Sequence, residues 1–446
     1  MGPAGSANSL ARRDLTQIYA AAVSAVDPSR LVALALEGHI AGAEKVPAIV
    51  ADAPRISAIA VGKAALGMAS AITERLGPRL RDMIVIVPAP AASDLCHSPA
   101  GSRIITAAHP IPDDSSLRAA EAAVELAGRA GAGELLLLGL SGGASSLMAL
   151  PAPPLKLDDK ISLNSALLRS GASIRDLNIV RRHLSAIKGG GLLRAAGGAR
   201  VLSLILSDVA NNDLATIGSG PTAADLSTFA DAIGVLKRRG LWGRAPEAVR
   251  ECLERGASGE VAETVKPGDP LLARVENVVI GDNRTALDVA ADAAAAAGYA
   301  VDQWRELYGE ADDLGRALGA HLAATGGGRT CVVAGGEPVV TVRGGGRGGR
   351  AQQAALAMAL ELERIARDRR IVALFAGTDG IDGPTQAAGA FCSPRTAERA
   401  REAGFEPGTA LRRNDSYPLF AALGDLLVTG PTGTNVSDIF IGLVNY

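Results

Sequence analysis

Residues 134–146 read ELLLLGLSGGASS, an apolar run that ends in two glycines and several hydroxyl side chains. An apolar run of four to eight residues bounded by turn residues predicts a strand buried on both faces of a parallel sheet. The loop after such a strand is where α/β sheets bind ligands. Glycines there let backbone N–H groups approach a ligand. The stretch therefore predicts a loop for an anion, phosphate above all.

Four further stretches repeat this pattern of apolar strand and polar loop. They read RVLSLILSDVANNDLATIGSGPT (200–222), CVVAGGEPVVTVRGGGRGGR (331–350), RIVALFAGTDGIDGPT (370–385) and DLLVTGPTGTNVSD (425–438). Strands alternate with helical segments along the chain, which predicts an α/β fold in both halves. At 446 residues the chain is too long for one ordinary core. We expect two domains, 10–255 and 256–446, because few apolar runs between 222 and 275 could anchor a sheet.

The composition narrows the classes of partner. The net charge is −2, with 45 basic and 47 acidic residues and no block of like charge, which disfavours nucleic acid and anionic lipid as partners. The four cysteines fit no metal-binding spacing and favour a reducing compartment. The first ten residues lack the basic and apolar regions of a signal peptide. We therefore expect a cytoplasmic protein without a membrane span.

Neither common nucleotide-binding motif is present. No GxGxxG opens a helix after the first strand, and Gly62-x4-Gly67 is not followed by Lys and Ser or Thr. Lys63 stands where the predicted strand 56–61 becomes a helix. A cation is unfavourable at a helix N-terminus, so an anionic ligand would explain this lysine. The alternative is a solvated lysine at a helix start.

Two basic segments accompany these loops. A helix predicted over 174–196 places Arg181, Ser185 and Lys188 on one face, where they would meet an anion or simply face water. A glycine-rich loop carries Arg350 to the start of another predicted helix. Arginine recognises phosphate and carboxylate with two parallel hydrogen bonds. The alternative for this loop is a flexible basic hairpin at the surface.

Three aspartates lie just beyond the ends of predicted strands, namely Asp208, Asp379 and Asp382. Carboxylates in such positions can hold Mg²⁺ together with substrate phosphates and water. They can equally form Asx turns with the backbone. Beside phosphate-type loops, the metal interpretation is favoured.

Many separate segments resemble the signature motifs of the glycerate 2-kinase family, and they occur in that family's order. The segments are VGKAALGMA, HPIPDDSS, LSGGASSLMALP, RRHLSAIKGGGL, LSDV, GSGPT, GDNRTA, GGEPVVTVRGGGRGGR, GTDGIDGPTQAAGA, NDSY and TGPTGTNVSD. The resemblance runs from about residue 10 to the end. It implies a Rossmann-like α/β/α N-terminal domain, a smaller α/β C-terminal domain of the MOFRL type, and an active site in the interdomain cleft.

The resemblance also implies an activity and its residues. The activity is ATP-dependent phosphorylation of D-glycerate to 2-phosphoglycerate, with Lys63 and Arg350 as catalytic residues and Gly142, Gly143, Ser145 and Ser146 at the nucleotide phosphates. For the rest of the ATP site we expect Ser141, Asp208, Gly220, Asn283 and Glu337. We also expect the substrate to be held by Arg181, Lys188, Asp379, Thr434 and Asn435, and Mg²⁺ by the strand-end aspartates Asp208, Asp379 and Asp382.

The sequence departs from the family pattern at two places. Family members commonly read GGRNQE where this chain has GGRAQQ, so Ala351 replaces an amide and Gln353 a carboxylate. The SDV-x-GD segment is here SDVANND, with Asn212 in place of glycine. The first departure puts in doubt a metal or substrate role at 351–353.

Two other classes of function stay open on the sequence. Proteins of this type are often labelled hydroxypyruvate reductases, although the chain lacks the dinucleotide motif. A non-catalytic sensor of sugar acids or nucleotides is the third alternative. In each case the partners are small molecules, and a homodimer is compatible with the sequence.

Overall fold

The computed structural model describes residues 3–89, 101–304 and 307–446. The chain divides into two compact units. The first unit is Pro28–Ile280, and the second joins Met1–Asp27 to Gly281–Tyr446.

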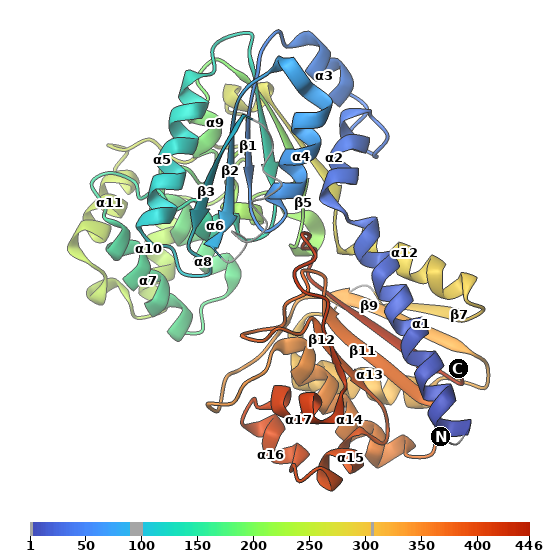
Figure 1. Cartoon of the computed structure of the whole chain (residues 1–446). Coiled ribbons are helices and arrows are strands. Elements are labelled where there is room, and N and C mark those ends of the chain that lie inside the picture. The colour runs from blue at the N-terminus through green and yellow to red at the C-terminus, as the bar shows by residue number, and fades with distance from the viewer. Residues whose placement is uncertain (1–2, 90–100, 305–306) are drawn as a thin grey trace. The chain divides into compact units, whose positions relative to one another are not determined.

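A six-stranded sheet forms the centre of the first unit, with strand order β3-β2-β1-β4-β5-β6 (Figure 1). β1 to β5 run parallel. β4 lies between β1 and β5, so all six of its residues are buried, as the apolar run predicts. The strands are β1 Ile56–Val61, β2 Leu80–Pro88, β3 Ser102–Ala107, β4 Leu135–Leu140, β5 Arg200–Leu206 and β6 Val275–Gly281.

Helices cover both faces of this sheet (Figure 1). α5 and α9 share a core with one face, while α4 packs on the other, where Gly139 of β4 leaves room for Met68. The helices of the sheet layers are α2 Pro28–Leu36, α3 Val46–Asp52, α4 Ala65–Leu76, α5 Asp114–Arg129, α6 Ala144–Leu147 and α9 Gly191–Ala195. Short 3₁₀ turns are η1 Gly77–Arg79, η3 Ala210–Asn212, η4 Ile217–Ser219 and η6 Pro270–Arg274.

Four helices of the first unit form a separate small core of their own. Their buried leucines, valines and Phe229 pack against one another rather than on the sheet. They are α7 Leu157–Arg169, α8 Ile174–His183, α10 Phe229–Arg238 and α11 Glu247–Ala257, with the turn η5 Trp242–Arg244.

The second unit contains a mixed sheet with strand order β13-β12-β11-β14-β9-β7. β14 runs antiparallel to both β9 and β11, so its first residue lies beside their last residues. Asp438 is thereby paired with Gly377 and with Gly336. The strands are β7 Ala300–Trp304, β9 Thr330–Gly336, β11 Ile371–Gly377, β12 Gly389–Cys392, β13 Leu426–Leu427 and β14 Asp438–Val444, with a ribbon of β8 Gly309–Glu310 and β10 Pro338–Val339.

α13 and α14 pack on one face of this sheet, and α1 and α12 lie on the other (Figure 1). Gly315 allows the close contact of the first pair, because a Cβ there would lie 2.2 Å from the carbonyl oxygen of Ala354. The Tyr19 hydroxyl of α1 donates to the Gly377 carbonyl at 2.7 Å. The helices are α1 Pro3–Ala25, α12 Asn283–Ala296, α13 Ala311–Ala324, α14 Arg350–Ala366, α15 Thr396–Glu402, α16 Pro407–Arg412 and α17 Ser416–Leu423.

The predicted α/β fold class is confirmed, but two details differ from the sequence-based expectation. The compact units do not divide at 255/256, because β6 extends the first sheet and α1 packs with the second. The predicted helix 174–196 is wrong. It is two helices, α8 and α9, separated by a turn in which Gly189 and Gly190 have positive φ.

One helical stretch, Ser9–Leu36, is long and apolar enough to cross a membrane by length and composition alone. Half of its most apolar window is buried, and the stretch is divided between α1 and α2. A core helix passes the same test, so this stretch is weak evidence for a span.

Candidate active site

The loops after β1 and β4 are joined by hydrogen bonds that fix Lys63 beside the SGGASS loop. The Lys63 N–H donates to the Gly142 carbonyl at 2.9 Å. The Ser141 hydroxyl accepts from the Ala64 N–H at 3.1 Å and donates to the Val61 carbonyl at 3.2 Å. The structure thus brings the predicted catalytic lysine and the predicted phosphate loop together.

Glycine is required where these loops cross. Gly62 has φ +121°, and a Cβ there would lie 2.1 Å from the Ser141 Oγ. Gly143 has φ +89° and precedes α6, and a Cβ there would lie 3.2 Å from the His109 ring. The buried Ser141 hydroxyl joins the two loops, so Ser141 positions the loop rather than offering its hydroxyl to a ligand.

The rest of the SGGASS loop enters a second polar network. The Ser146 hydroxyl donates to the Gly143 carbonyl at 3.1 Å, whereas the Ser145 and Ser219 hydroxyls lie 3.1 Å apart. Lys188 donates to the Ser145 carbonyl at 2.8 Å and also to its hydroxyl. The network links the loop after β4 to the turn η4.

Beyond Ser219, the same network reaches α8. The Ser219 hydroxyl donates to the Asn178 side chain at 3.1 Å. Gly220, the predicted ATP-site glycine, follows with φ +69° and accepts from the Gly190 N–H at 2.7 Å. Gly220 therefore anchors the turn that carries Lys188.

Arg181 and Lys188 come from different elements, because α8 ends at His183. The prediction that Arg181, Ser185 and Lys188 share one helix face is therefore wrong. Burial, and then the charges of Lys160 and Arg181, hold the pKa of Lys188 well below its ordinary value. Burial also lowers the pKa of Arg181. Lys160 of α7, which lies in none of the predicted motifs, belongs to the same cluster.

In the second unit, Arg350 at the start of α14 is held by two carboxylates. Its Nε and Nη2 donate to the two oxygens of Asp438 at 2.6 and 3.1 Å, and its Nη1 donates to Glu337 at 2.6 Å. Burial lowers the pKa of Arg350, but these two carboxylates outweigh burial and raise it above its ordinary value. Burial raises the pKa of Asp438, against the influence of Arg350. Arg350 is thus a fixed cation.

Asp379 follows β11 at the same sheet edge and is half-buried. One of its carboxylate oxygens accepts from the Ile381 N–H at 3.0 Å, which is an Asx turn. Its carbonyl accepts from the Thr432 N–H at 3.2 Å. The Asx turn holds the Asp379 carboxylate at the sheet edge where β11 ends.

Asp382 acts as an acceptor at the N-terminus of α14. Its two oxygens accept from the Ala351 N–H at 3.0 Å and from the Gln352 N–H at 2.8 Å, and the Gln352 amide adds a bond at 2.9 Å. Burial, and then Asp438, raise the pKa of Asp382 to about 7. This carboxylate is already satisfied, so it fits a metal ligand poorly.

Within the described ranges, 3–89, 101–304 and 307–446, no group of three or more His, Cys, Asp or Glu side chains could hold a metal ion. Asp208 lies half-buried between β5 and η3 in the first unit. Mg²⁺ commonly takes only one or two carboxylates together with phosphates. A carboxylate from Asp208 or from Asp379 is compatible with such a site in its own unit, whereas the carboxylate of Asp382 is not.

The departures from the family pattern in GGRAQQ lie within the helix. Ala351 and Gln353 are buried in α14. The Gln353 amide donates to Asp312 at 2.7 Å and to the Leu411 carbonyl at 3.0 Å. Gln353 therefore ties α14 to α13 and α16.

The remaining predicted residues support the loop that leads into β14. The Asn283 amide donates to the carbonyls of Val436 and Asp438 at 2.8 and 3.0 Å. The Thr434 hydroxyl donates to the Val26 carbonyl at 2.6 Å, and the Asn435 side chain accepts from the Ser437 N–H at 3.4 Å. Asn283 and Thr434 thus hold the backbone of this loop in place.

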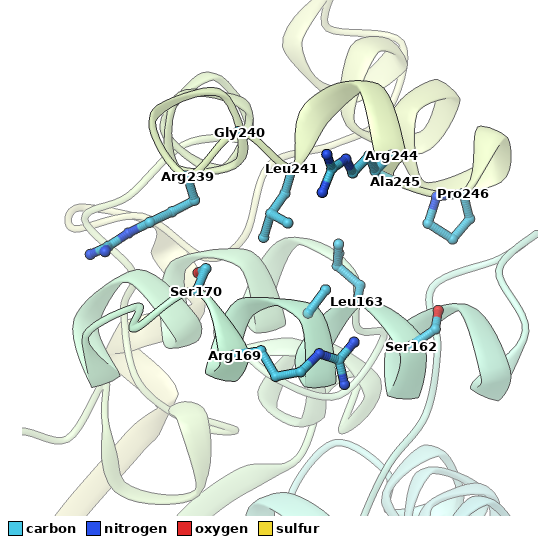
Figure 2. A pocket seen from close by; sticks show the side chains of 11 residues that line it. Ser162, Leu163, Arg169, Ser170, Arg239, Gly240, Leu241, Arg244, Ala245 and Pro246 are labelled. Atoms are coloured by element: carbon cyan, nitrogen blue, oxygen red, sulfur yellow. The ribbon is translucent and has the colours of Figure 1, made fainter. Parts of the chain in front are cut away.

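Two pockets in the first unit are lined by residues other than those predicted for the site. One of about 540 Å³ lies between α7 and the turn after α10, and Arg169, Arg239 and Arg244 line it (Figure 2). The other, of about 1060 Å³, has Asn178 and Arg182 in its wall. No residue predicted for the site lines either pocket, although Asn178 connects the larger one to Ser219.

Replacing Asp382 with alanine is expected to lower the free energy of unfolding by about 2 kcal/mol, because α14 loses its buried N-terminal acceptor. The folded pKa of about 7 exceeds the ordinary 3.8, so the wild type loses stability as pH rises between these values. The alanine variant should lack that loss. Chemical denaturation at pH 5 and pH 8 measures both effects. An unchanged stability with a raised Mg²⁺ requirement would contradict the structural role.

Comparisons with known proteins show the family to which the chain belongs. Residues 14–254 match the model of a domain of unknown function, DUF4147, and residues 330–438 match the MOFRL family. The chain is 37% identical to the glycerate 2-kinase of Pyrococcus horikoshii, covering 87% of each protein. It is also 38% identical to a putative hydroxypyruvate reductase of Agrobacterium vitis, over 96% of this chain and 93% of that one.

A solved structure extends the similarity to the fold. The crystal structure of glycerate kinase from Thermotoga maritima superposes with a TM-score of 0.81 at 35% identity, over 98% of this chain and all of that one. These matches place the chain among phosphotransferases that act on small molecules. Within that class, it belongs to the glycerate 2-kinase family. The resemblance of the sequence motifs is confirmed.

Proposed function

We propose that the protein transfers the γ-phosphoryl group of ATP to the 2-hydroxyl of D-glycerate and releases 2-phosphoglycerate and ADP. The observation that carries this proposal is the attachment of Lys63 to the SGGASS loop through the Gly142 carbonyl. Phosphoryl transfer needs little covalent chemistry from the protein, which mainly positions the reactants and neutralises charge. A lysine fixed beside a glycine-rich, N–H-rich loop suits both tasks.

Each unit contributes its own set of groups. In the first, the N–H groups of Gly142, Gly143 and Ser145 would bind nucleotide phosphates, and Lys63 would stabilise charge on the transferred group. Arg181 and Lys188 would bind anionic groups of the reactants. In the second unit, Arg350 would bind an anionic group of a reactant. Asp438 and Glu337 would orient its guanidinium. Asn283, Thr434 and Asn435 would support the loop before β14.

The remaining predicted residues would bind Mg²⁺ or support the loops. Asp208 in the first unit and Asp379 in the second would each be a candidate carboxylate ligand of Mg²⁺, which would supply positive charge to offset that of the ATP phosphates. Ser146 would add a hydroxyl beside the phosphates, and Gly220 would keep the η4 turn closed. Ser141 and Asp382 would serve the structure rather than the ligand.

The activity is tested with D-glycerate, ATP and Mg²⁺, and in parallel with hydroxypyruvate and NADH or NADPH. We expect ADP and 2-phosphoglycerate in the first reaction and no oxidation of NADH or NADPH in the second. Phosphorus NMR distinguishes the 2-phosphate from the 3-phosphate. The Lys63→Ala variant, purified identically, controls for a contaminating kinase. Formation of 3-phosphoglycerate, or oxidation of NADH or NADPH, would contradict the proposal.

A further inference from the structure

Three cations gather beside the SGGASS loop of the first unit. They are Lys160 of α7, Arg181 of α8 and Lys188 of the turn that follows α8. Lys160 and Lys188 expose only 5% and 4% of their surface. A buried cation normally has a carboxylate partner, because leaving water without one is costly.

Among the described residues, the hydrogen bonds of these cations go to neutral groups. The Lys160 ammonium donates to the Leu150 carbonyl at 3.4 Å, Arg181 donates to the Asn164 side chain at 3.3 Å, and Lys188 donates to Ser145. In the part of the chain that the structure describes, none of the three forms an ion pair with a carboxylate. The cluster therefore holds uncompensated positive charge.

The charges around Lys160 do not relieve this excess. Arg181 faces it from α8, and Lys188 faces it from the turn after α8. On its own helix, Asp158 is exposed, and Asp159 accepts from the Lys156 N–H at 2.9 Å. Burial, and then Arg181, lower the pKa of Lys160 to about 7. An arrangement so unfavourable in the empty protein suits a ligand that brings negative charge.

We propose that Lys160, Arg181 and Lys188 together bind one oxyanion of the reactants, a carboxylate or a phosphate, at the end of the SGGASS loop. This inference rests on the proposed function for the identity of the reactants. Arginine supplies planar recognition of the oxyanion, and the two lysines supply charge. Ser145 connects the cluster to the loop through Lys188.

Binding at this cluster is coupled to protons. A bound oxyanion stabilises the ammonium form of Lys160, so the protein takes up a proton where the free side chain is partly neutral. Since the pKa of Lys160 is about 7 without ligand, proton uptake by Lys160 is expected above pH 7 and decreases below it. Affinity for the oxyanion falls over the same range as pH rises.

Isothermal titration calorimetry of the whole protein tests the site. D-glycerate, inorganic phosphate and ADP are titrated separately at pH 8, in two buffers of different ionisation enthalpy. For wild type, we expect proton uptake with at least one ligand. Lys160→Met should weaken that ligand by about ten- to a hundredfold, the equivalent of one charge-assisted hydrogen bond, and reduce the uptake. Loss of affinity for D-glycerate alone identifies the carboxylate, and loss for phosphate and ADP identifies a phosphate.

Lys156→Met is the matched control, since Lys156 is exposed and precedes the same helix. It should bind all three ligands as the wild type does. Thermal unfolding separates the site from a structural role of Lys160. Removing an uncompensated buried charge should raise Tm. If the hydrogen bond from Lys160 to the Leu150 carbonyl is instead required for stability, Tm should fall. If Lys160→Met does not fold, Lys160→Gln and the pH dependence of wild-type affinity replace it.

The proposal is overturned if wild type binds none of the three ligands, or if the Lys160 variant keeps wild-type affinity and proton uptake for all of them. A lower Tm with unchanged binding overturns it too. The proposed kinase activity can fail independently. Binding that depends on Lys160 without turnover would keep the oxyanion site and reject the reaction.

Discussion

Replacing Lys63 with alanine should lower kcat by about a hundred- to a thousandfold, the usual effect of removing one preorganised group that stabilises transition-state charge. The fold should survive, because the hydrogen bonds that join the two loops use the backbone of Lys63 and Ala64 rather than the lysine side chain. Steady-state kinetics with D-glycerate and ATP measure the first effect, and thermal unfolding measures the second.

A matched control keeps this result interpretable. Lys45→Ala removes an exposed lysine of the same unit and should leave both kcat and Tm unchanged. Gly62→Ala should instead lose stability and activity together, because its Cβ would overlap the Ser141 hydroxyl at a positive φ. Near-normal turnover of Lys63→Ala would remove Lys63 from the catalytic residues.

The first unit could be predicted well from sequence because its signals are local. A run such as LLLLGL is buried on both faces of a parallel sheet, and the ligand loop follows each strand directly. The same logic placed Lys63 and the SGGASS loop at one edge of the sheet. Their hydrogen bonds, however, join residues almost 80 positions apart in sequence, and spacing alone could not reveal them.

Residues whose contacts depend on the direction of distant strands are harder to predict from sequence. Asp438 lies within hydrogen-bonding distance of Arg350 because β14 runs antiparallel to β9 and β11. No local sequence pattern predicts the direction of β14. The helix predicted over 174–196 is interrupted by a turn whose glycines approach Thr264 and Val265, far along the chain.

Lys160 did leave a signal that could have been used. It occupies the apolar stripe of α7, where Leu157, Leu163 and Leu167 are the other buried residues. A charged residue at the position where the helical period demands an apolar one is unexpected for a purely structural helix. Its partners Arg181 and Lys188 were named for their motif, but the common cluster required the tertiary structure.

Replacing Arg350 with methionine should both inactivate and destabilise the protein. Asp438 is buried, and without Arg350 its carboxylate lacks the cation that it binds through two hydrogen bonds. Removing one partner of a buried pair costs about 3 kcal/mol, the lower end of the usual range, since the Arg350 side chain is 32% exposed. Chemical denaturation measures the loss, and kcat should fall by about a hundredfold or more.

The pH dependence of this loss has a definite sign. Without Arg350, the folded pKa of Asp438 rises further above its value in the unfolded chain. A carboxyl with a raised folded pKa favours folding at low pH and loses that stability as pH rises through the interval between the two values. The destabilisation of Arg350→Met should therefore be largest at neutral pH and shrink toward pH 4.

The double variant Arg350→Met with Asp438→Asn separates stability from catalysis. Removing both charges takes away the unpaired carboxylate, so stability should return toward the wild-type value and lose its added pH dependence. Activity should stay low, because the guanidinium is still absent. Asp438→Asn alone keeps Arg350 with Glu337 and should retain more kcat than either variant without the arginine. Recovery of activity in the double variant would mean that Arg350 serves only to balance Asp438.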